Sequence, residues 1–129
     1  MKPTTVEWLE IAAEDLDAAE AMLRSGRYLY AGFEAQQAAE KALKAVLQEA
    51  ARVPPKIHNL VTLARDAGVD VQELLDRLAT LSAYYIATRY PEVRKELSQR
   101  TTLDVAESLL DTAREVHAWA KQHLTSSES

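Results

Sequence analysis

Hydrophobic positions repeat with helical spacing along the first half of the chain. The first stripe predicts a helix that ends at Ser25-Gly26, and Thr4 followed by Glu7 has the spacing of a capping box at its start. The second stripe predicts a helix over about 28–52, ended by Pro54-Pro55. The two stripes are Leu9, Ala12, Leu16, Ala19 and Leu23, and Gly32, Ala35, Ala39, Ala42 and Val46. Because small side chains let helices approach closely, we expect these two helices to form an antiparallel hairpin.

Two helices are predicted next. The first is short, over about 59–67, with Asn59 in the N-cap position and Gly68 directly after its end. The second covers about 71–90 and is ended by Pro91. Its apolar face consists of Leu74, Leu78, Leu81 and Tyr85.

The end of the chain holds one more apolar stripe. Residues 92–100 are charged and are predicted to form a loop, whereas a helix is predicted over about 102–124 and a loose, disordered tail over 125–129. The stripe of this helix is Leu103, Ala106, Leu110, Ala113, His117, Ala120 and Leu124. The pattern therefore predicts an all-α protein, an up-and-down bundle of about five helices in one domain over 1–124.

Composition narrows the class of protein. With only three Gly and four Pro, the 129-residue chain favours helix, and its length suits one domain. A net charge of −5 argues against bulk nucleic-acid binding, which needs many cations against phosphates. The chain has no cysteine, its first helix is acidic, and no 18-residue apolar run occurs. We therefore expect a cytoplasmic protein that neither enters nor crosses a membrane.

The helix over 102–124 carries more apolar surface than one stripe. Val105, Leu109 and Val116 form a second row, and Trp119 projects roughly opposite Leu110. The row either forms an oligomer interface, most simply of a homodimer, or packs within the monomer. Trp119 favours the oligomer, since a large exposed apolar side chain indicates an interaction site.

Polar side chains interrupt the apolar faces at three positions. Gln36 and Glu40 fall among apolar residues on the helical wheel, where buried polar groups need partners, although Glu40 also has the i,i+4 spacing to pair with Lys44 at a half-exposed edge. Arg89 projects in line with the apolar face of the helix over 71–90. It either forms a structural salt bridge with Glu40 or lines a cleft and holds an anion.

The three histidines show no catalytic or metal-binding spacing. His58 precedes a helix start, where it serves either as a turn residue or as an anion contact. His117 lies on an apolar stripe and is interpreted as a core or interface histidine, and His123 as a surface residue. Metal-ligand patterns, Gly-rich phosphate loops and the serine-hydrolase motif are absent from the sequence, so we expect neither a metal nor a cofactor.

Five groups of residues form a recognisable set of motifs. They are Trp8, Ala13 and Asp15-Leu16; Gly26-Arg27-Tyr28 and Phe33; the run from Gln36 to Lys44; His58-Asn59-Leu60; and the segment from Tyr85 to Pro91. Together these segments resemble the HEPN domain family, and the resemblance covers nearly the whole chain. The resemblance implies a bundle that commonly dimerises, that is proposed to bind nucleotides, and that often acts with a separate minimal nucleotidyltransferase chain, in some cases as a toxin–antitoxin pair.

Some HEPN proteins are ribonuclease toxins with an Arg followed, after four to six residues, by His. Neither Arg89 nor Arg100 has a histidine at that spacing, and the match from Arg52 to His58 spans Pro54-Pro55 outside the family's catalytic position. A protein that is not an enzyme on its own is therefore the first expectation. A metal-independent ribonuclease and a pure protein-interaction module stay as alternatives.

The resemblance and the inward polar residues define a predicted ligand cleft. Its residues are Gln37, Lys41, Lys44, His58, Tyr85, Arg89 and Tyr90. Arg89 and Lys44 are expected to hold phosphate, His58 to add a second anion contact, and Tyr85 or Tyr90 to stack on a base.

Overall fold

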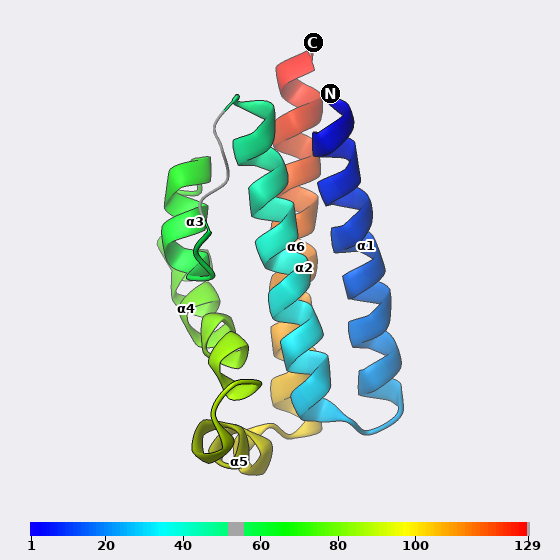
Figure 1. Cartoon of the computed structure of the whole chain (residues 1–129), viewed down its shortest axis with the longest axis vertical. Helices are drawn as coiled ribbons and strands as arrows, with labels where there is room; N and C mark the ends of the chain where they lie inside the picture. The colour runs from blue at the N-terminus through cyan, green and yellow to red at the C-terminus, as the bar shows by residue number, and fades with distance from the viewer. Residues whose placement is uncertain (52–55, 129) are drawn as a thin grey trace.

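The computed structural model describes residues 1–51 and 56–128, with side chains as far as residue 126, and these ranges contain six helices and no strand. The helices are α1 (Pro3–Arg24), α2 (Tyr28–Glu49), α3 (Leu60–Ala67), α4 (Gln72–Ala87), α5 (Pro91–Arg100) and α6 (Leu103–Glu128). Helices α1, α2 and α6 form a three-helix bundle, and α3, α4 and α5 form an arm beside α2 (Figure 1). The predicted all-α, up-and-down architecture is confirmed.

Helix α2 lies at the centre because its small side chains let neighbours pack on several sides. Gly26, with φ of 78°, turns the chain from α1 into α2, and the two helices form the predicted antiparallel hairpin (Figure 1). On the arm side, a Cβ added at Gly32 would lie 2.7 Å from the ring of Tyr84 in α4. The absence of a side chain at this position therefore allows α4 to approach α2.

The start of α1 differs from the prediction. Pro3 occupies the first turn, and the N-cap residue Lys2 makes no side-chain capping bond, so the predicted Thr4–Glu7 capping box is wrong. The carboxylate of Glu49 supplies the acceptor instead. It accepts hydrogen bonds from the backbone N–H of Lys2 at 2.9 Å and from Thr5 Oγ1 at 2.8 Å, which ties the end of α2 to the start of α1.

The helix ends around α3 agree more closely with the sequence. Asn59 Oδ1 accepts hydrogen bonds from the backbone N–H groups of Val61 and Thr62, and Gly68 adopts φ of 105°, so both predicted caps of α3 are confirmed. Helix α2 ends at Glu49, earlier than the predicted 52, and Pro54-Pro55 lies outside the described residues.

The charged stretch after α4 is a helix and not the predicted loop. Pro91 occupies the first turn of α5, Glu92 lies near its positive end, and Glu96 pairs with Arg100 at 2.7 Å. Helix α5 contains no buried residue, so it has no apolar stripe from which the pattern could predict it. At the other end of the chain, α6 continues to Glu128, so the predicted loose tail over 125–129 is wrong up to that residue.

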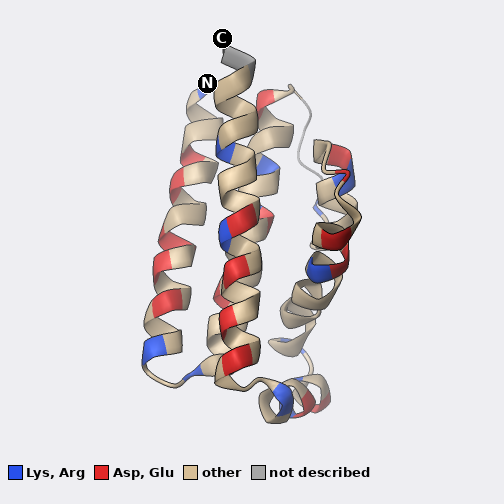
Figure 2. Ribbon diagram, turned by 180° about the vertical axis from the view of Figure 1, so that it is seen from behind, with Lys and Arg blue, Asp and Glu red and all other residues tan. Residues whose placement is uncertain are grey.

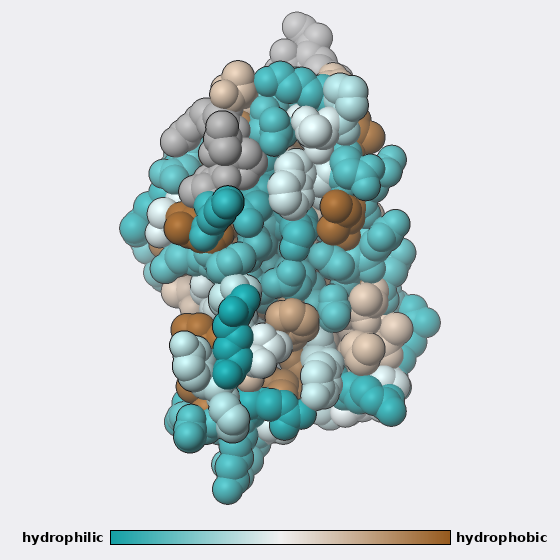
Figure 3. Space-filling model, in the orientation of Figure 1, coloured by the Kyte–Doolittle hydropathy of each residue, from teal (hydrophilic) through white to brown (hydrophobic). Residues whose placement is uncertain are grey.

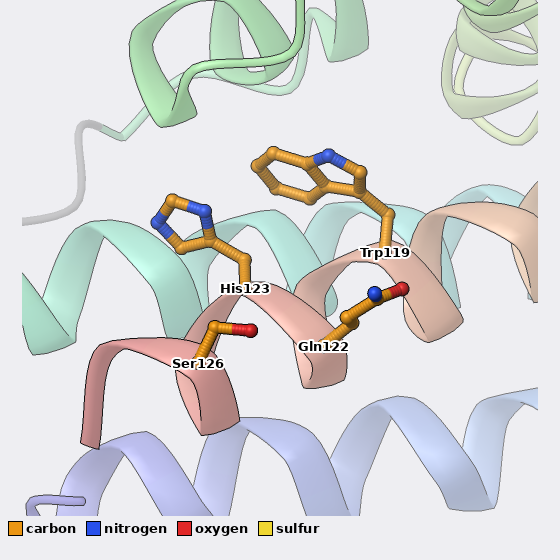
Figure 4. A pocket seen from close by; sticks show the side chains of 4 residues that line it. All are labelled: Trp119, Gln122, His123 and Ser126. Carbon is orange, nitrogen blue, oxygen red and sulfur yellow. The ribbon is translucent and has the colours of Figure 1, made fainter. Parts of the chain in front are cut away.

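Two of the three residues in the second apolar row of α6 pack within the monomer, and the third does not. Leu109 and Val116 are buried within the monomer, whereas Val105 is exposed. Trp119 is half-buried and stacks on His123, with ring centroids 5.0 Å apart. Figure 4 shows both rings on the same side of α6, where they line an open pocket of about 510 Å³. None of the helices in the described ranges is both long and apolar enough to cross a membrane.

Candidate functional site

The site is built around Glu40, a carboxylate that is 2% exposed in the middle of α2. Gln36 Nε2 and Lys44 Nζ, one turn before and one turn after it, each donate a hydrogen bond to the carboxylate at 3.0 Å. His58, from the connection between α2 and α3, places Nδ1 3.0 Å from Oε1 of Glu40. The inward positions predicted for Gln36 and Glu40 are confirmed, and the Glu40–Lys44 pair is buried rather than at a half-exposed edge.

Glu40 keeps its negative charge in this setting. Burial alone would raise the pKa of Glu40, but hydrogen bonds from Lys44, His58 and Gln36, together with the charge of Lys44, outweigh burial and hold that pKa below its ordinary value. An ionised carboxylate only accepts hydrogen bonds, so Nδ1 of His58 carries a proton. The pair therefore fixes the orientation of the imidazole and leaves Nε2 as its second functional nitrogen.

His58 is held from the other side by α4. Its ring stacks on Tyr85 with centroids 3.9 Å apart and planes 16° apart. Ser82 Oγ accepts the backbone N–H of Leu60 at 3.1 Å and donates to the carbonyl oxygen of His58 at 3.4 Å. The connection before α3 is thus fixed both by ring stacking and by hydrogen bonds.

Arg89 completes the series at the surface. Its guanidinium donates to the hydroxyl of Tyr85 and lies with Cζ 4.6 Å from the centroid of that ring. Contacts therefore run from the buried carboxylate of Glu40 through His58 and Tyr85 to an exposed cation.

A pocket of about 340 Å³ opens beside these residues. It is lined by Ile57, His58, Asn59, Ser82, Tyr85 and Ile86. Two of its walls, Ile57 and Ile86, are exposed apolar side chains. On the face drawn in Figure 3, hydrophobic residues occur as separate spots among hydrophilic ones. The pocket thus combines an apolar wall with an oriented imidazole and a nearby guanidinium.

Three of the segments that carried the sequence resemblance, 36–44, 58–60 and 85–91, contribute to this network. Comparison with known proteins agrees with the resemblance. Residues 5–123 match the model of the HEPN domain. The chain belongs to the HEPN domain family. No curated protein matches it.

Solved structures show the same HEPN fold. The chain is similar to TT1696 from Thermus thermophilus, with 33% identity, a TM-score of 0.82, and coverage of 94% of this chain and 98% of that chain. It is also similar to ST0689, an archaeal HEPN homologue, with 27% identity, a TM-score of 0.78, and coverage of 95% and 98%. A HEPN domain protein from Thermotoga maritima, at 24% identity and a TM-score of 0.72 over 92% and 98%, shows the same fold.

This HEPN domain brings together only part of the predicted cleft. His58 and Tyr85 line the pocket, and Arg89 contacts Tyr85. The predicted Glu40–Arg89 pair is not formed. Gln36, Lys44 and His58 occupy the carboxylate of Glu40, and Arg89 lies exposed past the end of α4 at Ala87. Tyr90 lies exposed at the N-cap of α5.

The predicted lysines and Gln37 lie along α2, behind the pocket. Lys44 is buried between Glu40 and the indole ring of Trp8, whose centroid lies 5.9 Å from Nζ. Lys41 donates to Gln37 at 2.9 Å, and Gln37 donates to Gln36 at 2.6 Å. Of the residues that line the pocket, Ser82, Ile57 and Ile86 were not predicted as site residues, and Asn59 was predicted only as an N-cap. Ser82 carried a usable signal, since it interrupts the apolar face of α4.

The ribonuclease motif of the family can also be placed. The three positions at the required spacing after Arg89 fall in α5 and hold Arg94, Lys95 and Glu96. The Arg52 of the remaining match lies outside the described residues.

Proposed function

We propose that this HEPN protein binds a nucleotide in the pocket between the α2–α3 connection and α4, without catalysing a reaction on its own. The observation that carries the proposal is the series in which Glu40 orients His58, His58 stacks on Tyr85, and Tyr85 seats Arg89 beside a pocket of about 340 Å³. A nucleotide combines a flat base with phosphate, and the pocket offers a partner for each.

The parts of the ligand match different residues. The apolar side chains of Ile57 and Ile86 suit the face of a base, and the exposed ring of Tyr90 offers a second stacking surface near Arg89. Arg89 has five N–H donors, of which the hydroxyl of Tyr85 engages only part, so the rest suit phosphate oxygens. Lys44 is already paired with Glu40, so we assign the phosphate contact to Arg89 and His58.

The proposal extends to assembly. We infer a homodimer and a separate minimal nucleotidyltransferase chain as partner, which would make this protein the substrate-binding half of a two-component system or one half of a toxin–antitoxin pair. Support for the dimer comes from Trp119, which stays half-buried on α6 beside an open pocket (Figure 4). A pure interaction module is the outcome if no nucleotide binds.

Isothermal titration calorimetry of the full chain with ATP, AMP and adenosine tests the proposal. We expect ATP and AMP to bind, and Arg89→Gln to weaken ATP binding by about tenfold or more, because a phosphate contact is lost. Adenosine binding should change little in this variant. Arg65→Gln is the matched control, since it removes the same charge from an exposed position of α3 that does not line the pocket.

Two results would contradict nucleotide binding. One is the absence of heat with all three compounds at millimolar concentration. The other is an equal loss of ATP affinity in Arg89→Gln and Arg65→Gln, which would indicate a general charge effect.

A ribonuclease is the second candidate, and the Glu40–His58 contact favours it. An imidazole oriented by a buried carboxylate is the usual arrangement of a general base, and Arg89 supplies a cation two contacts away. Incubation of the purified chain with a fluorescent RNA separates the candidates. Cleavage that His58→Ala abolishes would favour the ribonuclease, and intact RNA is expected from the nucleotide-binding proposal.

A further inference from the structure

Two adjoining cavities lie at the N-terminal end of α2, where the start of this helix meets the end of α4 and α5. The outer cavity, of about 190 Å³, is lined by Arg27, Ser98 and Thr101 among others, and the inner one, of about 110 Å³, by Phe33, Tyr84 and Ala87 among others. They share Leu29, Tyr30 and Arg94, so they form one groove, which we name the α2–α5 groove. None of its lining residues belongs to the pocket beside His58.

Arg94 is oriented in this groove but is not neutralised. Its guanidinium donates to the hydroxyl of Tyr30 at 2.6 Å and lies 5.5 Å from the centroid of the same ring. Within the described residues, no carboxylate lies within ion-pair distance of Arg94. Four other arginines do pair with carboxylates, namely Arg24, Arg77, Arg100 and Arg114. A cation held by a phenol keeps its charge available for an external anion.

The charge of the groove contrasts with that of the chain. Asp and Glu outnumber Lys and Arg by 20 to 15, yet among the described residues no Asp or Glu lines either cavity, whereas Arg27 and Arg94 do. Figure 2 shows acidic positions recurring along α1 and α6, Lys and Arg at the α1–α2 turn, and both signs of charge on α5, where three basic residues accompany two acidic ones. An anion is therefore attracted to this end of the molecule and repelled by the α1 and α6 surfaces.

The inner cavity is apolar and its floor is fixed. Tyr84 is 3% exposed, and its hydroxyl is 2.5 Å from Thr101 Oγ1, which in turn donates to the carbonyl oxygen of Leu97 at 2.5 Å. The Tyr84 ring also packs directly on Gly32. Because these contacts hold the ring in place, the cavity exists before any ligand enters, which lowers the cost of binding.

We propose that the α2–α5 groove binds a small organic anion, with the oxyanion at Arg94 and Arg27 and a compact aromatic or branched aliphatic group in the inner cavity. The two volumes together suit a ligand at the small end of the range for ligand pockets, roughly 300–1,000 Å³. The shared chemistry is one terminal oxyanion, phosphate or carboxylate, on an apolar group. This site is independent of the nucleotide pocket.

An NMR titration of the full chain, followed through its backbone amides, tests the site. The probes are phenyl phosphate and benzoate, which distinguish the two oxyanions, and inorganic phosphate and phenol, which each carry half of the ligand. We expect phenyl phosphate, benzoate or both to shift amides within 26–33 and 94–101, and each half to bind at least about tenfold more weakly.

Two variants with a matched control test the role of the cations. Arg94→Gln is expected to weaken binding of the better probe by about tenfold or more, because the bidentate contact is lost. Lys95→Gln, the control, makes the same charge change at the next residue of α5, which does not line the groove, and should bind as the wild type does. If Arg94→Gln fails to fold, Arg27→Gln, at an exposed position of the outer cavity, tests the same contact and is also expected to weaken binding.

Four outcomes would overturn the proposal. They are no shift at millimolar concentration of either organic anion, shifts centred on 57–60 with none in 26–33 or 94–101, equal binding of inorganic phosphate and phenyl phosphate, and equal effects of Lys95→Gln and Arg94→Gln.

Discussion

Glu40 stays ionised in the middle of α2 because three donors converge on its two oxygens. Removing a carboxylate and an ammonium from water costs several kcal/mol per ion, and the Glu40–Lys44 attraction offsets this cost only while both partners are present. The charge of Glu40 therefore stabilises the protein only together with its hydrogen-bond partners. The same hydrogen bonds orient His58.

Replacing Glu40 with Gln is expected to lower the free energy of unfolding by about 3–5 kcal/mol, because Lys44 is left buried without its counter-charge. Urea denaturation of the purified protein measures the change. Glu40→Gln/Lys44→Met should recover part of the loss. Glu20→Gln, in an exposed pair with Arg24, is the control and should change stability little. If Glu40→Gln changed stability as little as Glu20→Gln does, the prediction would be wrong, and water would have to solvate the Glu40–Lys44 pair.

His117 predicts a pH dependence of stability. Burial, with a smaller contribution from Lys121, lowers the pKa of His117, although a hydrogen bond with the Leu9 backbone partly opposes this. Among the described residues, no partner satisfies the buried Nε2 of His117. His117 therefore takes up a proton more readily in the unfolded chain than in the folded chain. The free energy of unfolding consequently falls as the pH drops below about 6.5.

Thermal unfolding at several pH values measures this dependence. His117→Leu should lose less stability than the wild type between about pH 6.5 and 5, since it has no group to protonate in the unfolded state. Identical pH profiles for the two proteins would assign the dependence to other groups.

The site was predictable only where regular helix geometry applies. The wheel correctly placed Gln36 and Glu40 inward, because α2 is continuous through both. It aligned Arg89 with Tyr85, and these two residues are in contact. The alternative that paired Arg89 with Glu40 is wrong, since Arg89 lies past the end of α4 at Ala87 and is exposed. The contact of His58 with Glu40 depends on the path of a connection that has no periodicity, so no sequence pattern could predict it.

At the scale of elements, the α2–α4 contact depends on Gly32. Gly32→Ala would place a Cβ 2.7 Å from the Tyr84 ring, which Thr101 holds in place, and 3.2 Å from Leu109. We expect a net loss of about 1–2 kcal/mol in urea unfolding, since crowding outweighs the helix propensity that Ala adds. Increased stability would show instead that Tyr84 moves aside without cost.

Helix α5 is the one helix that the sequence did not predict, since its residues were expected to form a loop. The pattern of apolar residues detects helices that bury a face, and α5 buries none of its residues. Its signals were local: Pro91 at the start, Glu92 in the first turn, and i,i+4 opposite charges at Glu96 and Arg100. The other helices were predicted because each has buried residues at helical spacing.

At the scale of the whole molecule, the proposed homodimer makes Trp119 the expected anchor. Light scattering at micromolar concentration should give the mass of two chains, and Trp119→Glu should shift it towards one, because a charge would enter the contact without a partner. Ala118→Glu, at a neighbouring exposed position of α6 that does not line this pocket, adds the same charge as a control. A single-chain mass for the wild type at all concentrations would contradict the dimer.

The arrangement of the arm beside the three-helix bundle bears on which parts open first. The arm packs mainly on α2, and α5 contributes no buried residue, whereas α1, α2 and α6 enclose a common core (Figure 1). Native-state hydrogen exchange should therefore be fastest for the amides of α5, slower for α3 and α4, and slowest for α2. The α2–α5 groove lies between arm and bundle, and the pocket beside His58 is lined by α4 and the connection that leads into α3. Occupancy of either should therefore slow exchange in the arm while leaving that of α1 almost unchanged.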